Sequence, residues 1–218
     1  MNRVKAIFYD FDGVIKESTE VKTLAFYNLY LPFGKEIADK VVEHHLKHGG
    51  VSRFEKFKYY HKTYLNKELS QEEIDVWAFQ FSELVLKSVI NSPYVEGAVD
   101  SIKTLDKTVQ QFIITGTPQR EINYILEKLE LSKYFVKVGG SPKNKIDWSR
   151  DLLKEFSLNS KDVLFIGDAL TDYEAAKYHG FSFLLRSHQE NLDYFNEVNV
   201  PKVENLNNLV TFVNNIKV

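Results

Sequence analysis

The feature that most constrains the fold is an alternation of short β-rich runs with helical patterns, broken once by a long segment without strands. The β-rich runs lie at residues 4–9, 109–114, 162–166 and 181–185, with a weaker one at 135–138. The helical patterns between them lie at residues 118–131, 144–156 and 171–179. This alternation predicts an α/β fold with a Rossmann-like parallel sheet and helices on both of its faces.

The segment without strands spans residues 16–91 and has helical patterns throughout. Its expected helices cover residues 20–31, 35–47, 51–64 and 71–90. The last of them opens with Ser70-Gln71-Glu72-Glu73, which is the pattern of a capping box. We therefore expect an α/β core domain of residues 1–15 and 92–218, interrupted by an all-helical domain of residues 16–91.

Three of the predicted strands end in polar residues. The first ends in Asp10 and Asp12, the second in Thr115 and Gly116, and the run at 162–166 is followed by Asp168. The carboxyl ends of parallel strands lie along one edge of a sheet, where ligands bind, so these residues are expected to converge. Two carboxylates as close as Asp10 and Asp12 are costly unless a cation, a proton or a substrate lies between them.

Each of these motifs also has a purely structural interpretation. The pair Asp12-Gly13 is common in turns, Thr117 can cap a helix that begins at Pro118, and the residues from Thr171 to Glu174 have the spacing of a capping box. A helix that begins after Thr117 would also direct free N–H groups toward a phosphate. The order of the motifs along the chain, rather than any one of them, favours a catalytic site.

The composition excludes several classes of function. The chain has 28 basic and 30 acidic residues, a formal charge of −2, and gives no reason to expect nucleic acid or a membrane as a partner. It has no cysteine, which excludes disulfides, thiolate metal sites and cysteine nucleophiles. We see no secretory leader pattern before the first strand and no apolar run of about 18 residues, so we expect a cytoplasmic protein.

Four ordered motifs resemble those of the haloacid dehalogenase (HAD) superfamily. They are Asp10-Phe11-Asp12-Gly13-Val14, a strand ending in Thr115-Gly116, a lysine before a helix, and the stretch Gly167-Asp168-Ala169-Leu170-Thr171-Asp172. The resemblance spans the whole chain, and the helical segment after the first motif is similar to the C1 cap of that family.

The resemblance implies a role for each motif residue. Asp10 is expected to be the nucleophile that forms an aspartyl-phosphate, and Asp12 the general acid and then the general base. Mg²⁺ is expected to bind Asp10, the backbone carbonyl of Asp12, and Asp168. Thr115 and Gly116 are expected to bind the phosphoryl oxygens. A proton on Asp12, together with the metal ion, would then make the crowded carboxylates tolerable.

The lysine of the third motif has two candidates, Lys143 and Lys145. Lys145 stands directly before the apolar-periodic part of its helix, so we prefer it as the residue that offsets the charge of the phosphoryl group. Asp172 is expected to hold this lysine or a metal-bound water.

Substrate specificity is expected to lie in the helical segment. Its turn at residues 48–53 contains two glycines, and Arg53 and Lys56 are candidates to contact an anionic or hydroxyl-rich part of the substrate, or else are solvated charges. The histidines His44, His45 and His48 suggest a metal site, because His44 and His48 share a helix face. Such a site is disfavoured, because no third ligand lies at a suitable spacing from these two. The aromatic residues of the segment are expected to form its core, and they are Phe54, Phe57, Tyr60, Tyr64, Trp77 and Phe81.

The resemblance and the residues together predict a Mg²⁺-dependent phosphatase. Its substrate is expected to be a small phosphorylated metabolite such as a sugar phosphate. The presence of Asp12 argues for phosphoryl transfer, because dehalogenases of this family need no proton donor at that position. A mutase of the β-phosphoglucomutase type and a non-catalytic binding protein that keeps the fold are the alternatives.

Overall fold

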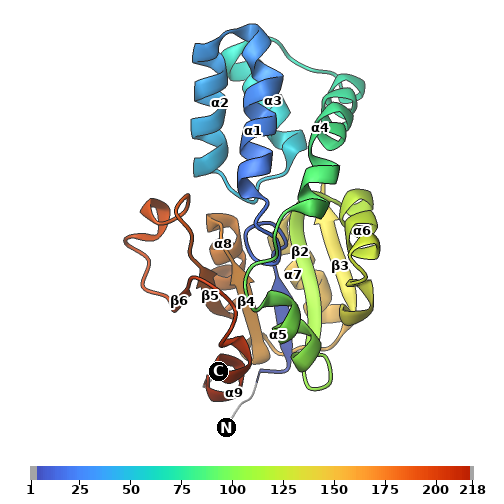
Figure 1. Cartoon of the computed structure of the whole chain (residues 1–218), viewed down its shortest axis with the longest axis vertical. Coiled ribbons are helices and arrows are strands. Elements are labelled where there is room, and N and C mark those ends of the chain that lie inside the picture. Colours follow the sequence, from blue (N-terminus) through green and yellow to red (C-terminus); the bar gives the residue numbers. More distant parts are fainter. Residues whose placement is uncertain (1–3, 217–218) are drawn as a thin grey trace.

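A computed structural model describes residues 4–216 of the chain, which form a parallel sheet flanked by helices and a separate helical group (Figure 1). The sheet has six strands in the order β3-β2-β1-β4-β5-β6, and every pair of neighbours is parallel. The strands are β1 (Ala6–Tyr9), β2 (Gln110–Pro118), β3 (Lys137–Ser141), β4 (Val163–Gly167), β5 (Ser182–Arg186) and β6 (Lys202–Val203). The predicted α/β fold with a parallel sheet is confirmed.

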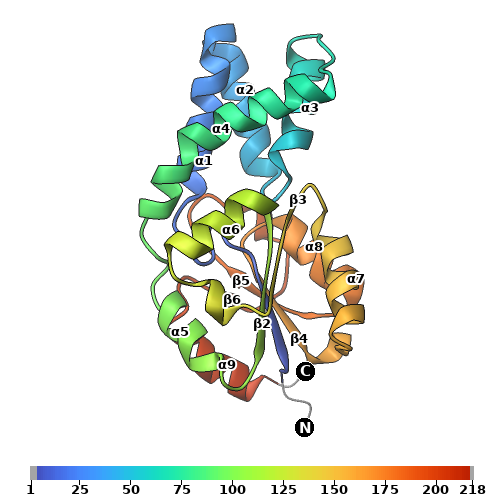
Figure 2. The same cartoon turned by 90° about the vertical axis from the view of Figure 1, so that its right-hand side faces the viewer.

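Helices cover both faces of the sheet, as Figure 2 shows from the side. One face carries α5 (Ala98–Leu105), α6 (Gln119–Lys128) and α9 (Leu209–Asn215), and the other carries α7 (Lys145–Glu155) and α8 (Leu170–His179). Successive residues of a strand point to opposite faces of the sheet. Ile7 therefore packs into the hydrophobic cluster on one face, and Phe8 packs into the cluster on the other. Burial on both faces explains why β1 and β4 are continuous apolar runs.

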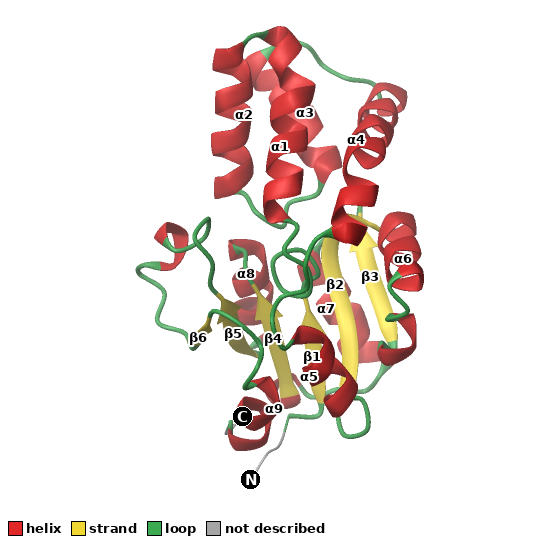
Figure 3. Cartoon of the chain, viewed as in Figure 1, coloured by secondary structure: helices red, strands yellow, loops and turns green. Residues whose placement is uncertain are grey.

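The helical group lies beyond the carboxyl ends of the central strands (Figures 1 and 3). It consists of α1 (Thr19–Tyr30), α2 (Lys35–Lys47), α3 (Arg53–Tyr64) and α4 (Gln71–Asn91). These helices match the four predicted ones, and the capping box at Ser70 and Glu73 is present. The assignment of residues 16–91 to a domain of their own stays a prediction, and residues 1–3 and 217–218 of the expected core domain lie outside the described residues.

Aromatic side chains fill the interior of the helical group. Phe57, Tyr60 and Phe81 are fully buried, and Phe26 packs against all three rings. The other aromatic residues predicted for this core are partly buried against it, and they are Phe54, Tyr64 and Trp77. The aromatic residues therefore hold the four helices together, as the sequence predicted.

Two connections join the helical group to the sheet, and they are bound to each other. Lys16 lies on the outgoing connection, where its buried ammonium donates to the carbonyl of Ile90 and stands 4.0 Å from the ring centre of Tyr94. The Glu17 N–H donates to the Pro93 carbonyl, and the Val95 N–H donates to the Ile15 carbonyl. The two connections therefore form one unit.

Two local predictions were wrong. Strand β2 continues through Pro118, so helix α6 begins at Gln119, and Thr117 is a strand residue rather than its cap. Helix α8 begins at Leu170, so Thr171 cannot cap it; the Asp172 carboxylate instead accepts a hydrogen bond from the Ala169 N–H. In both cases the polar residue predicted as a cap lies inside the neighbouring element.

Candidate active site

The ends of β1, β2 and β4 bring the predicted site residues together. Asp10, Thr115 and Asp168 are all buried, and with Asp12 and Gly116 they line a cavity of about 90 Å³ beneath the helical group. The Asp10 N–H donates to the Ile166 carbonyl, which fixes the end of β1 against β4. The convergence that the strand order implies is therefore present in the structure.

Lys145 lies between two carboxylates, one of which, Asp10, lines this cavity. Its ammonium stands 2.6 Å from Asp10 Oδ2 and 2.5 Å from Asp172 Oδ1, and only 5% of the residue is exposed. Lys143 turns outward instead, pairs with Asp151 and lies over the ring of Trp148. Of the two candidate lysines, the structure thus brings Lys145 into the site.

Burial and charge act in opposite directions on this cluster. Burial alone would lower the pKa of the Lys145 ammonium, but the carboxylates of Asp10 and Asp172 outweigh it and raise that pKa above its ordinary value. Burial raises the pKa of Asp10, and Lys145 opposes this rise. Burial likewise raises the pKa of Asp172. The site therefore holds more negative charge than Lys145 alone offsets.

Asp10, Asp168 and Asp172 can together hold a metal ion. Each offers a carboxylate oxygen, and these three atoms lie within 4.8 Å of one another. An all-oxygen set of buried carboxylates fits a hard cation such as Mg²⁺. Sequence reasoning placed Asp172 outside the ligand set; here its carboxylate lies with the other two and also contacts Lys145.

The Asp12 carboxylate points away from this cluster, toward the helical group. Lys22 of α1 forms an ion pair with it, Ser18 Oγ donates to it at 2.6 Å, and Thr117 Oγ1 donates at 2.9 Å. Burial alone would raise the pKa of Asp12, but Lys22 and these hydrogen bonds lower it. Lys22 thus supplies positive charge beside Asp12, and the proton expected on Asp12 during the reaction stays a prediction.

Two glycine positions allow the close approach of the loops around the site. Gly13 has a φ of +74°, and a Cβ on it would lie 2.1 Å from Asp168 Oδ2. A Cβ on Gly116 would lie 2.6 Å from the carbonyl oxygen of Gly50. Thr171 Oγ1 also donates to the Gly49 carbonyl. The predicted glycine turn of the helical group thus lies directly against the end of β2 at Gly116.

Arg53 is placed differently from either expectation. It is only 4% exposed, and its guanidinium forms two hydrogen bonds with the Glu121 carboxylate of α6, at 2.8 and 2.7 Å. It also donates to Ser82 Oγ of α4 and lies over the ring of Phe81. Arg53 is therefore not a solvated charge, and its positive charge is already paired, which argues against its predicted role in holding the substrate.

The histidines at the end of α2 do not belong to the carboxylate cluster. The rings of His44 and His48 stack at 3.9 Å, and His45 Nδ1 lies 2.7 Å from Lys56 Nζ. Within residues 4–216 these histidines form no group of ligands suited to a metal ion.

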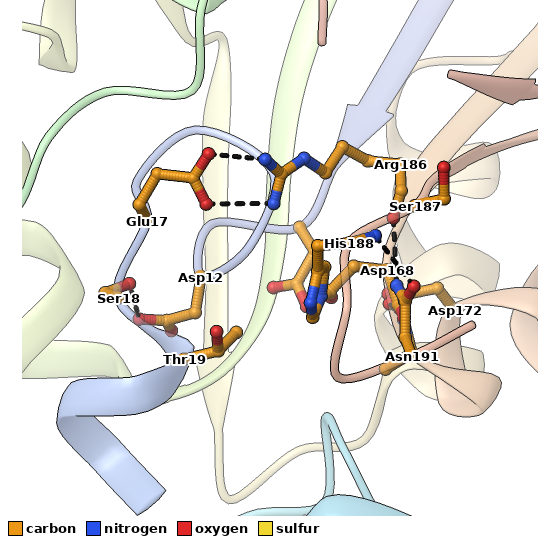
Figure 4. A network of polar contacts seen from close by, with 12 residues as sticks. Asp12, Glu17, Ser18, Thr19, Asp168, Asp172, Arg186, Ser187, His188 and Asn191 are labelled. Atoms are coloured by element: carbon orange, nitrogen blue, oxygen red, sulfur yellow. Dashed lines mark hydrogen bonds and ion pairs between the residues drawn. The ribbon is translucent and has the colours of Figure 1, made fainter. Parts of the chain in front are cut away.

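Several polar residues of the site were missed by sequence reasoning. His188 Nε2 lies 2.9 Å from Asp168 Oδ2, and Asn191 donates to the Asp168 carbonyl (Figure 4). Arg186, at the end of β5, forms a bidentate ion pair with Glu17. Because β5 was predicted and its end lies at the same edge of the sheet, these polar residues after it were a usable signal.

The sequence matches the haloacid dehalogenase-like hydrolase family over residues 7–185. The chain belongs to this family. The predicted family and the prediction of a hydrolase are confirmed. None of the helices within the described part of the chain is long and apolar enough to span a lipid bilayer.

Curated relatives of this family member carry the name phosphoglycolate phosphatase. The protein of that name (number 1) from Pseudomonas aeruginosa is 26% identical over 184 residues, which cover 81% of this chain and 66% of the relative. The one from Pseudomonas savastanoi pv. phaseolicola is 21% identical over 210 residues, which cover 86% of this chain and 71% of the relative. The chain thus spans just under two thirds of the first relative's length.

Solved structures of the family share the fold. A predicted phosphoglycolate phosphatase from Haemophilus somnus superposes with a TM-score of 0.74 at 17% identity, covering 97% of this chain and 99% of the other. A β-phosphoglucomutase from Clostridium difficile gives a TM-score of 0.72 at 19% identity, covering 94% and 93%. At these identities the likeness concerns the fold alone.

Proposed function

We propose that this protein is a Mg²⁺-dependent phosphomonoester hydrolase that works through an aspartyl-phosphate on Asp10. The observation that supports it most is the position of Asp10 and Asp12 on one small cavity, with Lys145 bound to the first carboxylate and Lys22 to the second. Two carboxylates in different polar surroundings suit two different roles, a nucleophile and a proton carrier. The names of the curated relatives support a small phosphorylated substrate.

The residues give each step a partner. An oxygen of Asp10 attacks the phosphorus, the bond from phosphorus to the leaving oxygen breaks, and Asp12 gives that oxygen a proton. Water then attacks the phosphorus of the aspartyl-phosphate, Asp12 takes the proton from this water, and phosphate leaves. The proton that Asp12 takes from water in the second step is the one that it gives to the leaving oxygen in the next turnover, and the Lys22 ammonium holds the Asp12 carboxylate in place. Thr115 and the Gly116 N–H bind phosphoryl oxygens.

Asp10, Asp168 and Asp172 would hold Mg²⁺, which would offset phosphoryl charge during transfer. Lys145 adds a fixed positive charge at the same carboxylates. The turn at Gly49 and Gly50 lies against Gly116, where a Cβ would come within 2.6 Å of the Gly50 carbonyl oxygen, so this turn would narrow the access to the cavity.

The alternatives remain but have less support. A cavity of about 90 Å³ is small beside the roughly 300–1,000 Å³ of typical small-molecule sites and favours hydrolysis of a short ester over a mutase reaction on a sugar bisphosphate. A binding protein has no need of Asp10, Asp12 and Lys145 together. The cytoplasmic location and the absence of a nucleic-acid or membrane partner stay predictions.

Phosphate release from a panel of small phosphate esters tests the proposal. We expect turnover that requires Mg²⁺ and is abolished by a chelator, and a loss of at least about 1,000-fold in the Asp10→Asn variant, because that variant lacks the nucleophile. A circular dichroism spectrum equal to that of the wild type would show that the variant is folded. Substantial turnover by folded Asp10→Asn protein would contradict the covalent mechanism, and no turnover of any ester by the wild type would contradict the hydrolase.

A further inference from the structure

The cavity has three cationic side chains from the helical group, Lys22, Arg53 and Lys56. Two of them have carboxylate partners. Lys22 pairs with Asp12, and Arg53 pairs with Glu121. For Lys56, the contacts within residues 4–216 include no carboxylate; its ammonium lies 2.7 Å from His45 Nδ1 and 3.4 Å from the His45 carbonyl oxygen. Lys56 is thus a cation on the cavity wall that lacks a counter-charge.

The buried position of Lys56 makes the lack of a carboxylate partner unfavourable in free energy. Only 2% of the residue is exposed, and its surroundings include the ring of Phe26, 5.6 Å from the ammonium. A buried ammonium without a carboxylate loses its hydration and gains no ion pair in return. Burial and the neighbouring Lys22 lower the pKa of Lys56 well below its ordinary value. An anion in the cavity would restore the missing partner.

His45 completes this part of the wall. It also lines the cavity, and its ring packs on Phe26 at 4.7 Å between centroids. An ammonium at Lys56 can only donate, so with Lys56 charged His45 Nδ1 is the acceptor of their 2.7 Å contact and the ring proton is on Nε2. The pair therefore presents donors only, an ammonium and a ring N–H, which suits an acceptor such as a carboxylate.

We propose that Lys56 and His45 form a second anion subsite that binds a carboxylate on the leaving group of the substrate. The proposal rests on the proposed function, since the phosphoryl group is taken to lie at Asp10. Because the cavity is small and both groups must fit into it, the substrate class is the phosphate monoester of a short hydroxy acid. The structure thereby gives the recognition role to Lys56, and Arg53 holds the wall in place through Glu121.

Hydrolysis of two esters that differ in one group tests the subsite. In 2-phosphoglycolate the leaving group carries a carboxylate, and in 2-hydroxyethyl phosphate a hydroxymethyl group replaces it. We expect the wild type to prefer the first ester, and Lys56→Met to lower kcat/KM for it by about 10- to 100-fold, the range of a lost charge-assisted hydrogen bond. For the second ester we expect a change of less than about threefold.

Lys58→Met is the matched control, because Lys58 lies on the same helix, is exposed and pairs with Glu55. We expect it to leave both rates within about twofold. Equal losses for the two esters in Lys56→Met, or no loss for either, would overturn the subsite while leaving the hydrolase in place.

A binding measurement separates the subsite from the reaction. Calorimetry with 3-phosphonopropionate and propylphosphonate compares a phosphonate that carries a carboxylate with one that lacks it, and neither can be hydrolysed as an ester. We expect the wild type to bind the first at least about tenfold more tightly, and Lys56→Met to lose this preference. Equal affinity of the wild type for the two ligands would overturn the subsite even if Lys56→Met failed to fold. Preferential binding without hydrolysis of any ester would overturn the phosphatase and keep the subsite.

Discussion

Lys145 and Lys143 lie two residues apart, yet their side chains point to different places: Lys145 into the carboxylate cluster and Lys143 toward Asp151. Lys145 is the first residue of α7, whose cap Asn144 accepts a hydrogen bond from the Asp147 N–H. A lysine is unfavourable in the first turn of a helix because of the helix dipole. Here two buried carboxylates compensate, since Asp10 and Asp172 both contact the ammonium. The ion pairs with these distant residues thus offset the unfavourable position of Lys145 in the first turn of the helix.

We expect Lys145→Gln to lower turnover by at least about 100-fold, because Asp10 and Asp172 would be left with uncompensated negative charge beside the phosphoryl group. The control is Lys143→Gln, which should stay within about threefold, since Lys143 pairs with Asp151 near the surface. Steady-state phosphate release at saturating Mg²⁺ measures both variants. A larger loss in Lys143→Gln than in Lys145→Gln would reverse the assignment.

At the scale of elements, a buried ion pair connects the helical group to the sheet domain. Arg53 is the first residue of α3, and Glu121 lies in the first turn of α6. Ser82 of α4 donates to the same Glu121 carboxylate at 2.5 Å. Three helices from two parts of the molecule therefore meet at one carboxylate. The hydrogen bonds hold the wall of the cavity closed against α6.

Removing one member of this pair should destabilise the protein strongly. We expect Glu121→Ala to lower the free energy of unfolding by about 3 kcal/mol, because the Arg53 guanidinium would stay buried without a partner. The double variant with Arg53→Met should regain most of this loss, since no unpaired charge is left. Urea titrations measure the free energies, and Glu127→Gln, on the exposed face of α6, is the control. An unchanged free energy of unfolding in Glu121→Ala would show that the Arg53–Glu121 ion pair is not formed in solution.

The longer elements were predictable, and the shorter ones were not. Helices α2 and α4 are long, α4 also has a capping box, and the observed bounds of both lie within one residue of the expected ones. Helices α5 and α9 and the two-residue strand β6 were not predicted, because each is shorter than the roughly ten residues over which a periodic pattern identifies a helix. The run expected at 135–138 appears as β3 at Lys137–Ser141, since it continues through two glycines of low strand propensity.

At the scale of the whole molecule, the sequence predicted which strand ends meet and that Asp172 could hold the motif lysine, but not the ion pairs made by the helical group. The alternation of strands and helices predicted a parallel sheet, whose carboxyl ends bring Asp10, Thr115 and Asp168 to one edge. The partners Lys22 of Asp12 and Glu121 of Arg53 depend on how the helical group sits on the sheet. That arrangement is set by packing of side chains between distant segments, for which no local sequence pattern exists.

The stability of the molecule should depend on pH through His44. Burial lowers the pKa of His44 to about 4, with further lowering by His48, Lys56 and Lys47. In the unfolded chain His44 takes up a proton as the pH falls below its ordinary pKa of 6.5. In the folded chain it stays neutral until the pH approaches its lowered pKa of about 4. The folded state is therefore fully favoured by this group above pH 6.5 and loses that contribution as the pH falls toward 4.

We expect the melting temperature of the wild type to fall more steeply between pH 6.5 and pH 4 than that of His44→Gln, which cannot titrate there. Thermal melts across this window, followed by circular dichroism, measure the difference between the two slopes. Carboxylates titrate alike in both proteins, so their contribution cancels. Parallel slopes would mean that His44 titrates normally in the folded state.

The paired connections at Lys16 and Tyr94 set how the helical group can move. Two connecting segments that are bound side by side act as a hinge. They would let the helical group rotate about one axis relative to the sheet, instead of about three. The Glu17–Arg186 ion pair fastens that hinge to the end of β5. A swing of the helical group about this axis would have to break two ion pairs to the sheet domain, Arg53 with Glu121 and Lys22 with Asp12. The covalent path of the chain would then fix the direction of such an opening, and these two ion pairs would oppose it.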